Sequence, residues 1–229
     1  MWDLIGRKYK VTNHKHYRDA DNAKLSKTLN RTGVEAVILT KNQMEQARAE
    51  LEKLLGEKYS DTIEDNLKVR NYYQVVNADA VYAIAKLNTA KNGVSGGTNV
   101  AVQLGIKLNK PVYVWDLTTE SWYKFDGKQF SVINTPTLTK NFAGVGTRDI
   151  EDYNVLDKQT GLWVPRKQFV GLEKAQKARK AIDDVYKKTF EQGAKRVESK
   201  QLSLFNEMSE TDIQAIQKQI EEHNKKCNR

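Results

Sequence analysis

The sequence has very few of the residues that form disulfide bonds and bind metals: one cysteine, Cys227, and three histidines in 229 residues. A single cysteine cannot pair within the chain, and a structural zinc site needs four nitrogen or sulfur ligands. We therefore expect no metal site and no internal disulfide bond. A reducing compartment such as the cytoplasm fits this composition.

Long apolar segments are also missing. No apolar run approaches the roughly 18 residues of a membrane-spanning helix. The opening segment, MWDLIGRKYKVTNHKHY, lacks the apolar core of about 7–15 residues that marks a signal peptide. We therefore expect a cytoplasmic protein that does not interact with a membrane.

Positive charge is in excess, and the excess is unevenly placed. The formal net charge is +9, yet residues 191–229 hold seven basic and seven acidic side chains, so the whole excess lies on residues 1–190. A positive surface attracts the phosphates of a nucleotide or of a nucleic acid. A well-solvated surface with no such ligand explains the same numbers, so both interpretations stay open here.

The clearest pattern lies in the middle of the chain. Residues 79–87 (DAVYAIAKL) form an almost continuous apolar run, which predicts a strand buried on both faces. A glycine-rich loop (88–98), a short helix (99–109) and a second buried strand (110–117, KPVYVWDL) follow. This order predicts a strand–helix–strand unit with its loop at the carboxyl edge of a parallel sheet.

Other elements complete an α/β pattern. We expect a strand over 33–40, a helix over 42–59 that stops near Gly56, and a hairpin over 121–133 with its turn at Asp126-Gly127. A further strand runs into a glycine turn over 141–150, 151–168 form a surface loop, and an amphipathic helix covers 171–193 and stops at Gly193. The predicted fold is a three-layer Rossmann-like domain with a mostly parallel sheet over residues 1–193.

The loop GVSGGT (93–98) is the best candidate for a ligand site. Glycines let the backbone approach a ligand closely, and the free N–H groups at the start of a helix attract a phosphate. The predicted phosphate-binding residues are Gly96, Gly97, Thr98 and Asn99. The simpler alternative is a tight turn that holds no ligand.

A second glycine turn repeats this pattern in GVGTRDI (144–150). Because the carboxyl ends of parallel strands share one edge of a sheet, the two turns are expected to face each other across a cleft. The predicted ligand-binding residues are Gly144, Gly146, Thr147, Arg148 and, with a weaker signal, Arg70. An arginine gives bidentate contacts to a phosphate or base. The alternative for each arginine is a surface residue paired with a nearby aspartate.

The stretch VVNADAVYAI…GVSGGTNVAVQLGIKLNKPVYVWD, with FAGVGTR after it, resembles the SLOG superfamily of Rossmann-like proteins over roughly residues 68–150. That superfamily includes the Lonely Guy phosphoribohydrolases, the YpsA-like proteins common in phage genomes, and the nucleotide-binding-like domain of the DNA-processing protein DprA. The resemblance implies a nucleotide or an ADP-ribose-like ligand, no certain cofactor, and a bacterial, phage-encoded protein.

The resemblance also bears on catalysis. The enzymes of this type, which are N-glycosidic or phosphoribosyl hydrolases and transferases, carry a glutamate on the helix after the glycine loop. Here Gln103 stands near that position, and glutamine is neither a nucleophile nor a general base. Asp116, at the end of the 110–117 strand, is the candidate catalytic carboxylate, with a ribose-hydroxyl acceptor or a helix cap as alternatives.

The two histidines His14 and His16 are spaced to share one side of an extended segment. Two histidines without a third ligand make a poor metal site. We expect them to be surface residues or part of a basic patch with the neighbouring lysines.

The tail over residues 194–229 is predicted to hold a linker, a short peptide and a helix over 209–226, which is a candidate contact with a second copy of the chain. The peptide QLSLF closely resembles the motif with which bacterial proteins bind the DNA polymerase sliding clamp. In such a peptide, the glutamine makes hydrogen bonds and the apolar side chains enter a pocket. The predicted partner-binding residues are Gln201, Leu202, Ser203, Leu204 and Phe205; the alternative is that they fold back onto the domain.

Two functions follow. The first is a SLOG-type protein that binds, and in one version processes, a nucleotide or nucleotide derivative and is recruited to DNA replication by the sliding clamp. The second is a non-catalytic, DprA-like accessory protein that binds DNA on its basic face. Few aromatic residues lie near the glycine loops to stack on bases, which favours the first.

Overall fold

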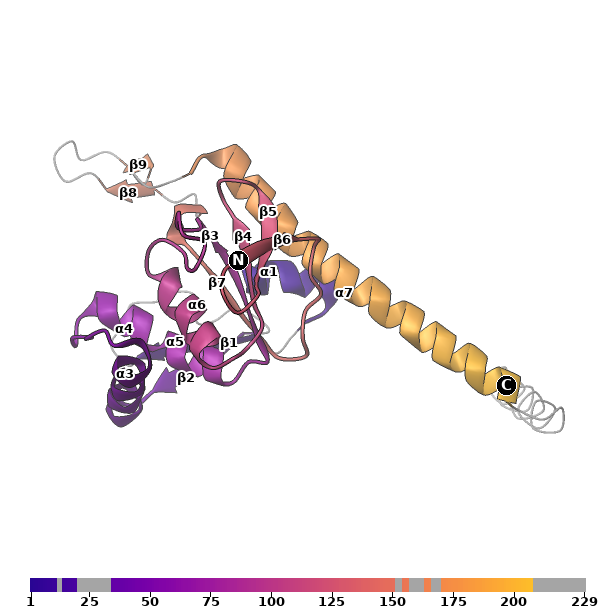
Figure 1. The fold of residues 1–229 in the computed structure, drawn as a ribbon, viewed down its shortest axis with the longest axis horizontal. Coiled ribbons are helices and arrows are strands. Elements are labelled where there is room, and N and C mark those ends of the chain that lie inside the picture. The colour runs from indigo at the N-terminus through magenta and orange to yellow at the C-terminus, as the bar shows by residue number, and fades with distance from the viewer. Residues whose placement is uncertain (12–13, 20–33, 151–153, 157–162, 166–169, 208–229) are drawn as a thin grey trace, which may run out of the picture. The chain divides into compact units, whose positions relative to one another are not determined.

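The computed structural model describes residues 1–11, 14–19, 34–150, 154–156, 163–165 and 170–207. It divides into two compact units, Met1–Lys188 and Thr189–Arg229. The first unit has an α/β fold, in which helices flank a five-stranded sheet of strand order β6-β5-β4-β3-β7 (Figure 1). Its strands are β3 (Ala80–Ala85), β4 (Val112–Asp116), β5 (Ser121–Phe125), β6 (Phe130–Ile133) and β7 (Phe142–Gly146).

The sheet is mixed, which corrects the expectation of a mostly parallel one. β3 pairs in parallel with β4 and β7, but β4–β5 and β5–β6 are antiparallel. Only a short turn joins β4 to β5, and a connection that short can only return the chain antiparallel. The predicted hairpin is confirmed: the N–H of Asp126 donates to the carbonyl of Gln129, and Gly127 takes a left-handed φ of 103° at the turn.

Two smaller sheets, of two strands each, are separate from the five-stranded sheet in their strand pairing. β1 (His14–Asp19) and β2 (Val34–Leu39) pair in parallel, and β8 (Asn154–Leu156) pairs antiparallel with β9 (Trp163–Pro165). The β2 strand was predicted, whereas β1 was not. β8 and β9 lie in the segment 151–168 that was expected to be a surface loop.

The helices are α1 (Trp2–Gly6), α3 (Lys41–Leu55), α4 (Ile63–Val69), α5 (Asn71–Val76), α6 (Thr98–Lys107) and α7 (Leu172–Glu207), with short 3-10 turns η1 (Arg7–Tyr9) and η3 (Arg148–Ile150). The α3 helix begins with a capping box between Thr40 and Gln43 and ends at Gly56, whose φ is 74°. The predicted stop at Gly56 is therefore confirmed. Among the residues described, none of the helices has both the length and the apolar character that crossing a membrane requires.

β3 is buried on both faces, as its apolar run predicts. Val81, Ala83 and Ala85 join a core with α3, α5 and α6, while the alternate residues Tyr82 and Ile84 join a second core with α1 and the first half of α7. The two faces of the strand thus anchor two helical layers. The β3–α6–β4 unit therefore has the predicted order, and it places the loop before α6 at the carboxyl end of β3.

The α7 helix does not end at Gly193. It continues to Glu207, so the predicted stop at Gly193 is wrong, and the segment 194–200 that was predicted to be a linker has a helical backbone. The residues that flank Gly193 (Glu191, Gln192, Ala194, Lys195 and Arg196) are strong helix formers, and one glycine inside a helix costs only about 1 kcal/mol. The QLSLF residues belong to the helical backbone of α7, and the helix predicted over 209–226 lies outside the described residues.

Candidate functional site

A pocket with a volume of about 1940 Å³ is lined by β7, β1, α4, α5, the start of α6 and the first residues of the chain. Most of the predicted ligand-binding residues line this one pocket: Arg70, Gly96, Gly97, Thr98, Gly144, Gly146, Thr147 and Arg148. They come from three separate stretches of the sequence. The predicted meeting of the two glycine turns is therefore found in the structure, whereas Asn99 and Asp116 do not line the pocket.

The start of α6 faces this pocket through Gly96, Gly97 and Thr98. Gly96 has a left-handed φ of 77°, and Thr98 is only 8% exposed. The carbonyl of Gly96 accepts from the Asn99 N–H at 3.0 Å. The N–H groups of Gly97 and Thr98 have no backbone acceptor within the described part of the chain, so they are the donors left for an anion at the positive end of the helix.

Asn99 and Gln103 hold the loop rather than a ligand. Asn99 Oδ1 accepts from the N–H of Val94 at 3.0 Å, and Gln103 Nε2 donates to the carbonyl of Asn92 at 2.8 Å. Both side chains pack closely against Gly93, where a Cβ would lie 2.7 Å from Gln103 Nε2 and 2.8 Å from Asn99 Oδ1. This position therefore has no room for a larger residue. Contrary to the prediction, the Asn99 N–H is thus used inside the turn. Gln103 fixes the shape of the glycine loop.

The second glycine turn follows β7. The N–H of Thr147 donates to the carbonyl of Ile84 in β3 at 2.9 Å, and the Thr147 hydroxyl accepts from the N–H of Asp149 at 3.2 Å. These bonds hold the turn against the end of β3. Arg148 is exposed at the pocket, and its guanidinium makes no hydrogen bond or ion pair among the described residues. It is therefore available to an anionic ligand.

Gly144 has a different role from the one predicted. A Cβ on Gly144 would lie 2.5 Å from the indole ring of Trp2, and the Trp2 Nε1–H donates to the carbonyl of Val145 at 3.2 Å. The indole therefore packs directly against the backbone of β7 at this glycine. Gly144 is required for packing, although it also lines the pocket.

Positive charge is concentrated near the two turns. Arg70 is half-buried, and its guanidinium donates to the carbonyls of Leu67 and Tyr17, both at 3.3 Å. Burial, together with the charges of Arg18 and Arg148, lowers the pKa of Arg70 to about 10, against the opposing effect of Asp19. Arg18 and Arg148 are thus each close enough to repel Arg70, and an anion bound near Arg70 would relieve this repulsion.

Asp116 lies away from this charge and acts as a structural residue. Its side chain is 3% exposed, Oδ1 accepts from the N–H of Leu87 at 2.9 Å, and Oδ2 accepts from the N–H and hydroxyl of Thr119. Each oxygen of the carboxylate is therefore already engaged. These contacts make Asp116 the cap of the turn between β4 and β5 rather than the helix cap considered above, because a strand and not a helix follows this turn.

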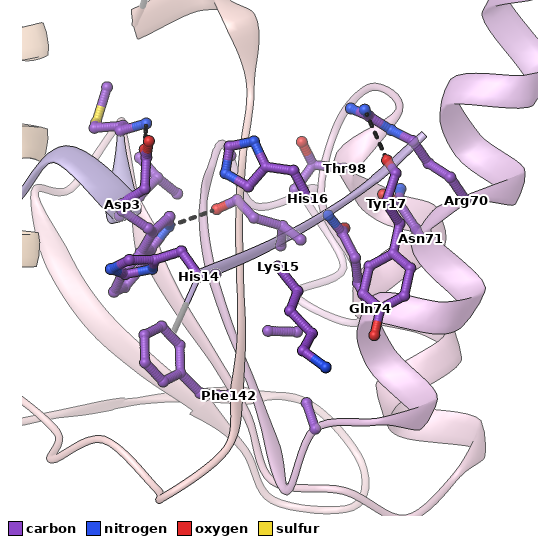
Figure 2. Close-up of a pocket in the computed structure, with 18 of the residues that line it drawn as sticks. Asp3, His14, Lys15, His16, Tyr17, Arg70, Asn71, Gln74, Thr98 and Phe142 are labelled. Atoms are coloured by element: carbon purple, nitrogen blue, oxygen red, sulfur yellow. Dashed lines mark hydrogen bonds and ion pairs between the residues drawn. The ribbon is translucent and has the colours of Figure 1, made fainter. Parts of the chain in front are cut away.

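The pocket includes residues that the sequence did not single out as ligands. Figure 2 shows His14 and His16 of β1 near Asp3 on one side, and Tyr17 of β1 with Asn71 and Gln74 of α5 on the other. Burial lowers the pKa of both histidines, with the Asp3 carboxylate opposing that effect. The alternation of HKHYRD is the only sequence signal for this strand. It is weak because the strand has no apolar run.

The described residues contain no group of three or more histidine, cysteine, aspartate or glutamate side chains arranged to hold a metal ion. No family model, curated protein or solved structure matches the chain. The pocket must therefore be interpreted from its own chemistry.

Proposed function

We propose that the protein binds a nucleotide or a nucleotide derivative through its phosphate, in the pocket between the two glycine turns. The observation that carries this proposal is the convergence of Thr98, Arg70 and Arg148, from separate parts of the chain, on one pocket. Backbone N–H groups at the start of α6 and a guanidinium with no other partner in the described structure are the donors that phosphate oxygens require.

The fold supports the same proposal. The parallel β3–α6–β4 unit and the helical layers on both faces are the features of a three-layer Rossmann-like domain, and they agree with the resemblance to the SLOG superfamily. Ligands of open α/β sheets bind beyond the carboxyl ends of the strands. The glycine loop after β3 and the turn after β7 both lie at such ends.

We favour binding without turnover. Gln103 is committed to the carbonyl of Asn92, and the Asp116 carboxylate is committed to Leu87 and Thr119. Neither side chain lines the pocket, so neither is placed to act at a glycosidic carbon. The proposed role is therefore that of a nucleotide-binding protein.

Recruitment to DNA replication is the second part of the proposal. It rests on the sequence of residues 201–205, QLSLF, and on their place in the second compact unit, at the end of α7. A bacterial sliding clamp is the proposed partner. This part can fail without affecting the phosphate site.

A ligand-dependent melting assay tests the phosphate site. Two ligand pairs that differ by one phosphate, adenosine with AMP and ribose with ribose 5-phosphate, are compared with ADP-ribose. At 100 times its Kd, a ligand that binds only the folded state adds about 2.7 kcal/mol of stability, which raises the Tm of a chain of this size by roughly 5–10 °C. We expect such a shift only with phosphorylated compounds. Equal shifts with and without the phosphate, or none at all, would contradict the proposal.

A further inference from the structure

Two side-chain amides on α5 line the pocket beside the phosphate-binding arginines. Asn71 and Gln74 are three residues apart, which places them on the same face of the helix. Both are half-buried and both line the pocket, and in Figure 2 they lie on the side of Arg70 and Tyr17, away from Asp3 and His14.

Neither amide makes a hydrogen bond with any described residue, although neighbouring amides do. Asn77, one turn further along, donates to the Tyr17 hydroxyl at 3.1 Å and to the carbonyl of Tyr73 at 2.9 Å. Asn66 on α4 donates to Asp61 and accepts from Arg48. Asn71 and Gln74 are thus the amides of this region that keep their full hydrogen-bonding capacity for something in the pocket.

Asn71 and Gln74 lie next to Arg70 of the proposed phosphate site in the sequence. Arg70 immediately precedes Asn71, and Gln74 lies about 4.5 Å further along the helix axis, at 1.5 Å per residue. Tyr17 lines the same side of the pocket and adds an aromatic ring, which packs against Tyr73 with ring centroids 6.1 Å apart. A ligand whose phosphate lies among the arginines can therefore reach these amides and this aromatic ring with its other end.

We propose that Asn71 and Gln74 form a base-recognition subsite for adenine, so that the ligand is an adenine nucleotide. A carboxamide presents a donor and an acceptor side by side, which matches the neighbouring N6 donor and N7 acceptor of adenine. At the corresponding edge guanine offers two acceptors, O6 and N7, which arginine or lysine match better. Its other edge, with the N1–H donor beside O6, is the competing match for a carboxamide, so GMP is included in the test. This inference rests on the proposed phosphate site and adds the class of base.

The test measures Kd for AMP, GMP and ribose 5-phosphate on the full chain and on Asn71→Ala and Gln74→Ala. One hydrogen bond contributes roughly 0.5–1.5 kcal/mol, and tenfold in affinity corresponds to about 1.4 kcal/mol. We expect the unmodified chain to prefer AMP over GMP and ribose 5-phosphate by about tenfold or more. In each variant the preference for AMP over the other two ligands should be roughly 3- to 10-fold smaller. The Kd for ribose 5-phosphate should be unchanged.

Two further variants sharpen the result. Gln74→Met keeps the length of the side chain and adds no charge but removes its hydrogen-bonding groups, and it should lose the preference for AMP as Gln74→Ala does. Gln129→Ala removes an exposed amide in the β5–β6 turn, outside the pocket, and should change nothing. Melting of each free variant shows whether its fold is intact.

The outcomes separate the two proposals. If the unmodified chain binds AMP and ribose 5-phosphate equally, or if the α5 variants weaken both equally, the base subsite is wrong and the phosphate site stands. If the chain binds AMP and GMP equally but both better than ribose 5-phosphate, the assignment to adenine is wrong. If no phosphorylated compound binds, the phosphate site is wrong and the base subsite falls with it.

Discussion

At the scale of single residues, two glycines of the same strand differ in what surrounds them. A Cβ at Gly144 would enter the Trp2 ring, whereas a Cβ at Gly146 would meet its nearest atoms, on Ile84, at an ordinary 3.7 Å. Gly144→Ala should therefore displace the indole and break its bond to Val145, at a cost of about 1–3 kcal/mol in the free energy of unfolding. Gly146→Ala is the matched control. Urea unfolding that gives equal stabilities for the two variants would contradict this packing.

Gln103 provides a second test at this scale, because it stands near the position where the enzymes of the SLOG superfamily, which the sequence resembles, carry a glutamate. Gln103→Glu would place a carboxylate against the carbonyl of Asn92 and the Oδ1 of Asn99, both of which are acceptors. We expect a loss of about 1–2 kcal/mol of stability, from a lost donor and an unpaired acceptor, and no gain of nucleotide hydrolysis. Hydrolysis of AMP to adenine by this variant, measured chromatographically, would show that the carboxylate reaches a bound ligand.

The residue scale also shows what could be predicted from the sequence and what could not. The glycine–threonine start of α6 and the GVGTR turn were predictable, because glycines at the end of a strand indicate a tight turn that the backbone of a ligand site can use. The packing role of Gly144 and the place of Asn71 at the pocket were not. The first depends on Trp2, 142 positions earlier in the sequence, and the second depends on which face of a six-residue helix meets the pocket.

At the scale of elements, β1 carries two histidines that line the pocket and change protonation state between the folded and the unfolded chain. Burial lowers the pKa of His14 and His16 below the ordinary value of 6.5, while Asp3 opposes this effect and Arg7, Arg18 and Arg70 add to it. The unfolded chain therefore binds protons at a higher pH than the folded chain, and stability should fall as the pH drops below about 6.5. The lowered pKa of Asp3 acts only below its ordinary 3.8, outside this range.

We expect the Tm to decrease by a few degrees between pH 7.5 and pH 5.5. The double variant His14→Gln/His16→Gln should show a smaller decrease, because it removes the groups that take up protons on unfolding. A Tm that is constant or rises toward pH 5.5, or an unchanged slope in the double variant, would contradict the burial of these imidazoles.

Two glycines show how far helix ends could be predicted. Gly56 ends α3 with a left-handed φ, whereas Gly193 continues the helical backbone of α7. Both follow an amphipathic run, so the residues before each glycine do not separate them. The polar helix formers after Gly193 were the available signal. In the same way, the apolar β3 and β4 were predictable, but the polar β1 forms only because β2 pairs with it.

At the scale of the whole molecule, the net charge of +9 allows a nucleic acid as well as a nucleotide. Nucleotide binding in the pocket predicts that short single-stranded DNA does not displace AMP at 150 mM salt. The displacement of AMP by DNA is measured by fluorescence anisotropy at increasing salt concentrations. If DNA displaces AMP, and if this displacement becomes steeply weaker as the salt concentration rises, the DprA-like alternative is supported instead.

The peptide at residues 201–205 gives a separate prediction for the whole chain. If it binds a bacterial sliding clamp, Leu204→Ala/Phe205→Ala should weaken that binding at least about 30-fold, because apolar anchors of short peptides carry 2 kcal/mol or more. The control Leu172→Ala removes an exposed leucine at the other end of α7 and should bind as the unmodified chain does. Clamp binding that is absent, or the same in both variants, would remove the sliding clamp as partner.

The central claim, a phosphate site between two glycine turns, is tested most directly by calorimetric titration of AMP into the full chain and into Arg148→Ala. Arg179→Ala, which removes an exposed arginine of α7 outside the pocket, is the control. Arg148→Ala loses a charge-assisted contact worth about 1.5–3 kcal/mol, so its affinity for AMP should be roughly 10- to 100-fold lower. The affinity of Arg179→Ala for AMP should be unchanged. Saturable binding of equal affinity in all three proteins, or no binding heat in any, would contradict the account.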